Sequence, residues 1–223
     1  MRGNSVHAII YQDYGKTGLK FRQRERMNVM ATIVTPHIIK ESSRGYSTVD
    51  ILDDMLQNRE VECVGEITDE SVYSLCRQLR YLHRLDPQKE ITMFINSSGG
   101  SVADGLALYD VMKGIACPVR TVCLGTAASM AAVLFASGNQ RDILPHGKVM
   151  IHDPLIGRTG GSALQLQAVS RGLMATREHL ASILAEHTGH SLEEIYEKTM
   201  RDTYFDAEEA VAFGLADRVI TQI

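Results

Sequence analysis

The chain has 223 residues, 44% of them hydrophobic and 22% charged, and its formal net charge at pH 7 is -4. This length suits one large domain, the composition is that of an ordinary soluble protein, and the small acidic charge disfavours nucleic-acid phosphate as a partner. The longest apolar run, Ala127 to Ala136, is shorter than the roughly 20 residues that a membrane-spanning helix needs, so we predict no membrane contact.

Residues 1–32 are predicted to be a weakly structured extension, and residues 33–223 to be one domain. The extension carries tyrosines, lysine and arginines but lacks the apolar core of a secretory signal. The four cysteines, at positions 63, 76, 117 and 123, form no C-x-x-C pair. We therefore predict a reduced, cytoplasmic environment and no structural metal.

From about residue 61, short apolar runs alternate with helical periodicity, which predicts βαβ units and an α/β fold. Thr68 is placed to cap a helix that Asp86-Pro87 ends, because the residue before proline avoids helical angles. The helix has an apolar stripe at Val72, Leu75, Leu79 and Leu82. A strand is predicted over residues 91–95, and a second over residues 119–124.

Between these strands, the Gly99-Gly100 turn leads to a helix with apolar positions at Val102, Leu106, Tyr109, Val111 and Met112. Beyond His152, the glycine-rich residues 157–162 predict a loop that leads to a long helix ending at Thr188-Gly189. Its apolar stripe comprises Leu166, Val169, Leu173, Leu180, Ile183 and Leu184. Capping boxes are predicted at Ser191–Glu194 and Asp206–Glu209, and a final strand at 218–221 after Gly214.

Ser129 stands where an apolar run turns into an alanine-rich helix, which is a favourable position for a nucleophile. A serine hydroxyl needs a base to remove its proton and a third group to orient that base. Free N–H groups at a helix start would also favour negative charge on a substrate oxygen. The plainer interpretation is that Ser129 caps the helix or is a small residue needed for close packing.

His152 is the best-placed base among the eight histidines, since it follows the apolar residues 149–151 and would emerge at a strand end. Its plainer interpretation is a histidine in a hydrogen-bonded turn. For the orienting acid, the residues alone do not separate Asp202 from Asp153 or Asp142. The Gly99-Gly100 turn could be a tight connection or a pair of backbone N–H groups that bind an oxyanion.

Three stretches closely resemble the ClpP family, the proteolytic subunit of the Clp protease. They are FINSSGGSV at 94–102, GTAASM at 125–130 and VMIHDPL at 149–155. Further matches occur at 43–45, 185–189, 201–202, 207–211 and 214–215. The resemblance therefore covers roughly residues 33–223, and chance agreement of so many ordered motifs is remote.

The resemblance implies a serine endopeptidase with Ser129 as nucleophile, His152 as base and Asp202 as orienting acid. It implies an oxyanion hole made by the N–H groups of Gly100 and Met130. The implied fold is the ClpP/crotonase type of repeated ββα units, whose long handle helix joins two stacked heptameric rings. No cofactor is expected in this subunit, since a partner ATP-driven unfoldase would use the ATP and deliver unfolded proteins.

Some residues depart from the family pattern. Ser98 stands where the family usually has proline, and Thr92 and Gly114 stand where it commonly places aromatic side chains for unfoldase docking. The extension is longer than the usual leader, so we expect either a propeptide that is removed or a true start at Met27 or Met30. The alternatives are a largely non-catalytic ring subunit that assembles with an active paralogue, and a crotonase-type enzyme acting on an acyl-CoA.

Overall fold

The computed structural model describes residues 36–42 and 45–223, so the predicted extension at 1–32 lies outside the described residues. The chain divides into two compact units, Met1–Asn58 and Arg59–Ile223. In the first unit, β1 (His37–Ser42) pairs antiparallel with β2 (Gly45–Asp50), and α1 (Ile51–Gln57) follows. The side chain of Asp50 caps α1 by accepting the N–H of Leu52 at 2.8 Å.

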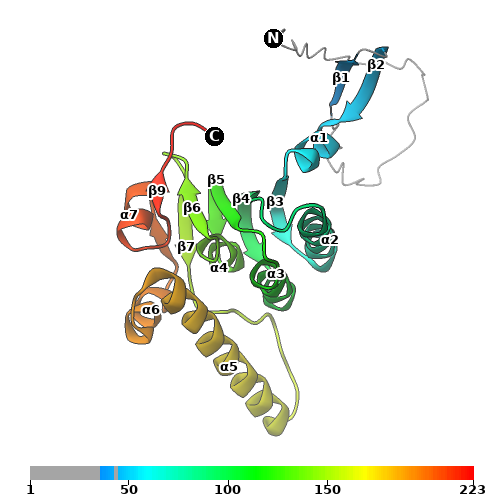
Figure 1. Ribbon diagram of the computed structural model, residues 1–223. Coiled ribbons are helices and arrows are strands. Elements are labelled where there is room, and N and C mark those ends of the chain that lie inside the picture. Colours follow the sequence, from blue (N-terminus) through cyan, green and yellow to red (C-terminus); the bar gives the residue numbers. More distant parts are fainter. Residues whose placement is uncertain (1–35, 43–44) are drawn as a thin grey trace, which may run out of the picture. The chain divides into compact units, whose positions relative to one another are not determined.

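A seven-stranded sheet forms the centre of the second unit (Figure 1). Its strands are β3 (Glu60–Ile67), β4 (Ile91–Gly100), β5 (Val119–Ala128), β6 (Gln140–Ile143), β7 (Lys148–Ile151), β8 (Thr203–Phe205) and β9 (Arg218–Val219). Strands β3, β4, β5, β6 and β9 lie side by side in that order and pair in parallel. Strand β7 pairs in parallel with β5, and β8 pairs antiparallel with β7. The predicted α/β class is confirmed.

This unit has six helices, and all but α4 begin at a residue whose side chain caps them. They are α2 (Asp69–Leu85), α3 (Val102–Gly114), α4 (Met130–Ala136), α5 (Ala163–Thr188), α6 (Leu192–Thr199) and α7 (Ala207–Ala212). Thr68 caps α2, and the predicted capping boxes at Ser191 and Asp206 are both present. Local side-chain chemistry thus determines where these helices start.

Strands β4 and β5 continue beyond their predicted ends at residues 95 and 124, so those two predictions were too short. The apolar run stops there, but backbone pairing does not, since Ile67 pairs with Gly100 and Ser97 with Ala127. The last strand, conversely, ends at Val219 rather than at residue 221. The extra length of β4 and β5 carries Gly100 and Ser129 to the same end of the sheet.

Helix α4 is buried along its whole length and packs against the sheet. Helix α3 approaches it closely at Gly105, where a Cβ atom would collide with the side chain of Met130. The buried positions of α3 are Gly105, Leu108 and Met112, whereas Leu106 and Tyr109, which we assigned to its apolar stripe, are half-buried. This close packing fixes the start of α4, directly after Ser129.

The predicted long helix is present as α5, which extends away from the sheet (Figure 1). Its second half is buried at Leu180, Ala181, Ile183 and Leu184. Its first half leaves Leu164 77% and Met174 57% exposed. Only the second half of the predicted apolar stripe is therefore covered within this single chain. Gly189, with a φ of +78°, ends the helix in the left-handed conformation.

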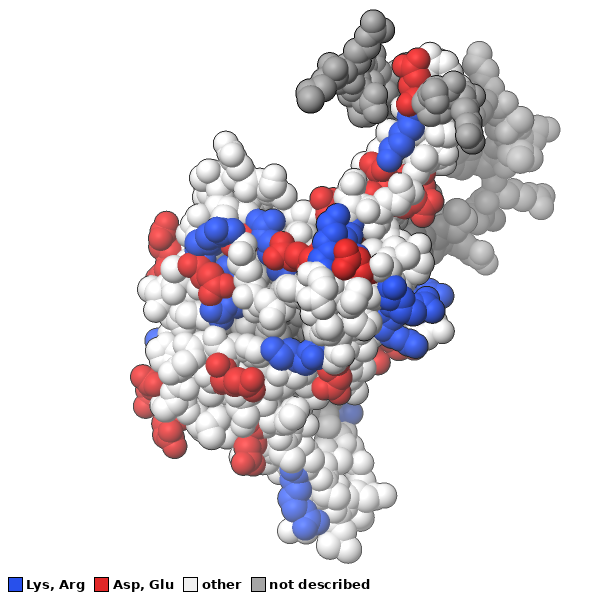
Figure 2. Space-filling model, viewed as in Figure 1, with Lys and Arg blue, Asp and Glu red and all other residues white. Residues whose placement is uncertain are grey.

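Charged side chains of both signs are interspersed over the face shown in Figure 2, with basic side chains gathered over α2. The sequence of α2 supplies Arg77, Arg80 and Arg84.

None of the helices in the described residues is long and apolar enough to cross a membrane.

His187 is a half-buried titratable group in the last turn of α5. Its ring lies edge-on to Tyr109 with the ring centroids 6.1 Å apart. Its Nε2 is buried and has no hydrogen-bond partner among the residues that the structure describes. Burial and the positive charge of Lys113 lower the pKa of His187 below its ordinary value of 6.5, and Glu186 offsets this only in part.

We predict that acidification destabilises the fold through His187. The folded state keeps this imidazole neutral, whereas the unfolded chain takes up a proton at the ordinary pKa, so the free energy of unfolding falls as the pH drops from about 7 to 5. Denaturant unfolding at a fixed protein concentration measures this. The variant His187→Phe should flatten the pH dependence, while His179→Phe, at an exposed position of the same helix, should not. An unchanged slope in His187→Phe would contradict the prediction.

Candidate active site

Ser129 forms a sharp turn between β5 and α4. Its φ of +56° and ψ of -124° lie in a region that residues other than glycine rarely adopt. Its N–H donates to the carbonyl of Met150 at 2.8 Å, which ties the turn to β7. The side chain makes no capping hydrogen bond to α4, so the capping interpretation is wrong. The hydroxyl is presented outward from a strained strand-to-helix turn, as in nucleophile elbows.

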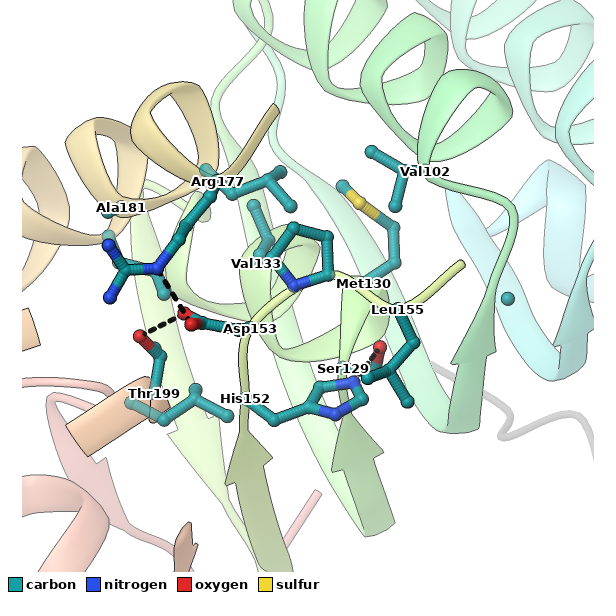
Figure 3. Close-up of a pocket in the computed structure, with 15 residues that line it drawn as sticks. Val102, Ser129, Met130, Val133, His152, Asp153, Leu155, Arg177, Ala181 and Thr199 are labelled. Atoms are coloured by element: carbon teal, nitrogen blue, oxygen red, sulfur yellow. Dashed lines mark hydrogen bonds and ion pairs between the residues drawn. The ribbon is translucent and has the colours of Figure 1, made fainter. Parts of the chain in front are cut away.

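His152 directly follows β7 and points at this hydroxyl (Figure 3). The Nε2 of His152 lies 2.8 Å from the Oγ of Ser129. The Nδ1 of His152 lies 3.4 Å from a carboxylate oxygen of Asp202, and the imidazole is 14% exposed. When Nδ1 carries the proton, Nε2 accepts the serine hydroxyl and Nδ1 faces the carboxylate. This is the order of contacts that a serine nucleophile requires.

The sequence left three candidates for the orienting acid, Asp142, Asp153 and Asp202, and the structure gives each of them different partners. Asp142 is fully buried between Arg120 and Arg218. Burial opposes its charged form, but hydrogen bonds from Arg218, Gln140 and Arg120 prevail and lower the pKa of Asp142. The Asp153 side chain pairs with Arg177 and Thr199. Among the three candidates, only Asp202 contacts the imidazole.

The Gly99-Gly100 turn lies against Ser129. Both glycines have positive φ, +96° and +152°. A Cβ atom on Gly99 would stand 2.7 Å from the Cβ of Ser129 and 3.1 Å from the backbone nitrogen of Met130, and one on Gly100 would collide with the carbonyl of Ile67. The turn is thus a tight connection, and it also brings its backbone next to the strained serine. Gly100 and Met130 both line the pocket beside Ser129.

A cavity of about 240 Å³ opens beside Ser129 and His152. Its apolar walls include Val102, Val133, Ile151, Pro154, Leu155, Leu180, Ala181 and Leu184. In Figure 3, Asp153, Arg177 and Thr199 gather on one side of this cavity, away from Ser129. The arrangement combines a serine hydroxyl, an imidazole within hydrogen-bond distance of it and an apolar recess, a combination that is chemically able to carry out acyl transfer.

Two polar residues of the pocket, Arg177 and Thr199, were not among the candidates considered from the sequence. Arg177 lies three and four positions before Leu180 and Ala181, so it shares the face of α5 that covers the pocket. That helical spacing was a usable signal for Arg177. Thr199 gave no such signal, because its position depends on how α6 ends.

Comparison with known proteins identifies relatives over most of the chain. A family model described as "Clp protease" matches residues 43–223. The chain is 42% identical over 191 residues to "ATP-dependent Clp protease proteolytic subunit 2" of Chlamydia trachomatis serovar D, covering 84% of this chain and 93% of that relative. It is 41% identical, over the same shares, to "ATP-dependent Clp protease proteolytic subunit 1" of Chlamydia felis.

The variant Gly99→Ala should strongly slow reaction of Ser129 with a fluorophosphonate probe. The added methyl group would displace the Ser129 turn, and a misplacement of about 1 Å can cost about 100-fold in rate. The second-order rate of labelling measures the effect. Gly114→Ala is the matched control, because its Cβ would meet nothing within 4 Å and Gly114 does not line the pocket. Labelling of Gly99→Ala at the rate of the unmodified chain would contradict the importance of this contact.

Proposed function

This chain belongs to the Clp protease family, and we propose that it is a serine endopeptidase subunit that cleaves unfolded proteins to short peptides. The observation that carries the proposal is the contact of 2.8 Å between the hydroxyl of Ser129 and Nε2 of His152, made by a serine whose side chain forms no capping hydrogen bond to α4. Family membership also removes the reason for considering an acyl-CoA substrate.

The proposed reaction proceeds through an acyl-enzyme. Nε2 of His152 takes the hydroxyl proton while Oγ of Ser129 attacks the substrate carbonyl, and the backbone N–H groups of Gly100 and Met130 receive the oxyanion. His152 then gives its proton to the departing amine. A water molecule, activated by the same imidazole, releases the acyl group and restores Ser129.

Asp202 has the role of holding the imidazole in the productive tautomer and stabilising the imidazolium that forms. Its distance of 3.4 Å from Nδ1 is longer than an ideal hydrogen bond. Contacts of this kind tighten when substrate is bound. The apolar walls of the pocket suit an apolar substrate side chain.

Assembly is the second part of the proposal. We propose that the subunit forms two stacked heptameric rings in the cytoplasm and works with an ATP-driven unfoldase. The exposed apolar residues in the first half of α5, such as Leu164 and Met174, favour burial against another copy. The relatives are named as proteolytic subunits of an ATP-dependent protease. Those names support a partner that uses ATP, which is the role of the unfoldase.

A mixed ring is the alternative assembly. Thr92 is half-buried, and Gly114 is exposed and would have nothing within 4 Å of a Cβ atom, so neither supplies an aromatic docking surface. The relatives are numbered as proteolytic subunits 1 and 2. A subunit with a modified docking surface could therefore sit beside an active paralogue that recruits the unfoldase.

Replacing Ser129 by Ala should abolish cleavage of a fluorogenic peptide and labelling by a fluorophosphonate, while leaving assembly intact. Asp202→Asn should keep the shape of the site but lower kcat by about 10⁴-fold, because the imidazole would adopt the wrong tautomer. Peptidase kinetics and native mass spectrometry on the same samples measure both effects. A purified chain that neither reacts with the probe nor cleaves peptide in any assembly state would refute the proposal.

Mixed rings built with Ser129→Ala in this chain and an active paralogue separate the two assemblies. We expect total peptidase activity to fall in proportion to the share of Ser129→Ala subunits, because each subunit contributes its own site. Activity unchanged by the substitution would instead assign this chain a structural role in the ring.

A further inference from the structure

We propose that Asp153 is a positioning residue, which holds the segment carrying His152 in register with the segment carrying Asp202. The inference rests on the proposed function, because it concerns the same catalytic site. It comes from three contacts of one residue, none of which touches the reacting atoms. The carboxylate was considered above only as an orienting acid, and it does not contact the imidazole.

Asp153 bonds to Thr199 through both backbone and side chain. Its N–H donates to the carbonyl of Thr199 at 2.7 Å, and its Oδ1 accepts the hydroxyl of Thr199 at 2.7 Å. Thr199 is buried at the end of α6, a few residues before Asp202. Among the described residues, that hydroxyl also contacts the carbonyl of Tyr196, at 3.5 Å. Asp153 is therefore the main partner of the Thr199 hydroxyl.

The residue before His152 in the chain is also held against the segment that carries Asp202. Ile151, which precedes His152, pairs with Thr203, which follows Asp202, in the antiparallel ladder of β7 and β8. The two chain neighbours of His152 thus each pair with a residue on one side of the Asp202 turn, Ile151 through the strand register and Asp153 through hydrogen bonds. Removal of the Asp153 contacts would leave the pairing of β7 with β8 to hold this turn against the His152 segment.

The second carboxylate oxygen of Asp153 links the His152 segment to α5. It accepts Nε of Arg177 at 2.7 Å. The guanidinium of Arg177 also lies 4.0 Å above the ring centroid of Tyr196, on α6. Asp153 and Arg177 are both partly exposed at the pocket. One carboxylate therefore joins the His152 segment, α5 and the end of α6, as Figure 3 shows for Asp153, Arg177 and Thr199.

A positioning role predicts an effect on the chemical step rather than on substrate binding. We expect Asp153→Asn and Thr199→Val each to lower kcat about tenfold or more with little change in KM, since small misplacement of catalytic groups is costly in rate. Thr199→Ser, which restores a hydroxyl, should recover most of kcat. The double variant should lose less kcat than the product of the two single losses, because both changes weaken the contact between Oδ1 of Asp153 and the Thr199 hydroxyl.

The control is Asp217→Asn, which removes a carboxylate from another arginine pair, that of Arg141 and Asp217, outside the pocket. It should leave kcat unchanged. Native mass spectrometry and thermal melting of every variant separate loss of assembly or folding from loss of positioning. Retained kcat in both Asp153→Asn and Thr199→Val would overturn the proposal.

Two further outcomes would also overturn it. The first is a change confined to KM that differs among peptides with Lys, Glu or Leu before the cleaved bond, which would assign the Asp153 and Arg177 pair to substrate recognition. The second is loss of kcat in Thr199→Val that Thr199→Ser does not recover. If the unmodified chain does not react with a fluorophosphonate, the proposed function itself fails; if it reacts and the variants match it, only the positioning role fails.

Discussion

The turn at Ser129 is the constraint on which the site depends. Holding a serine at a φ of +56° costs on the order of 1–3 kcal/mol, so the surrounding contacts must maintain it. The carbonyl of Met150 holds its N–H, the backbone of Gly99 lies against its Cβ, and the whole of α4 is buried behind it. The core therefore bears the strain, and the hydroxyl is directed away from the helix N–H groups that a serine at this position would ordinarily bond.

The parallel sheet explains why distant segments converge on that turn. Gly100 ends β4, Ser129 follows β5 and His152 follows β7, and β5 pairs in parallel with both of the other strands. The carboxyl ends of parallel strands meet at one edge of the sheet, where α/β proteins place their ligands. The strand order thus brings Ser129, His152 and the glycine turn to the same edge of the sheet.

The sequence was most predictive where structure is local. The caps at Thr68, Ser191 and Asp206 and the α2 stripe were all foreseen, because each depends on side chains within one or two turns. The ends of β4 and β5 were not, since polar and small residues continue a strand whenever a neighbour offers backbone partners. The choice among three carboxylates likewise required distances between segments, and the residue pattern around Asp202 contains none. The resemblance named Asp202 without such distances, and its catalytic role stays a prediction.

Because the side chain of Asp202 is exposed to solvent, its attraction to His152 is weak and other contacts must hold the Asp202 turn in place. Its side chain is 60% exposed, and in water two unit charges about 4 Å apart attract each other by only about 1 kcal/mol. Fixing the backbone of a single residue costs a similar or larger free energy. Attraction to an imidazolium therefore cannot by itself keep the Asp202 turn in register with His152. That register must come from hydrogen bonds to less exposed groups, and the ladder between Ile151 and Thr203 supplies one such tie. The carboxylate can consequently remain open to solvent while its distance to the imidazole is set by the backbone on which it stands.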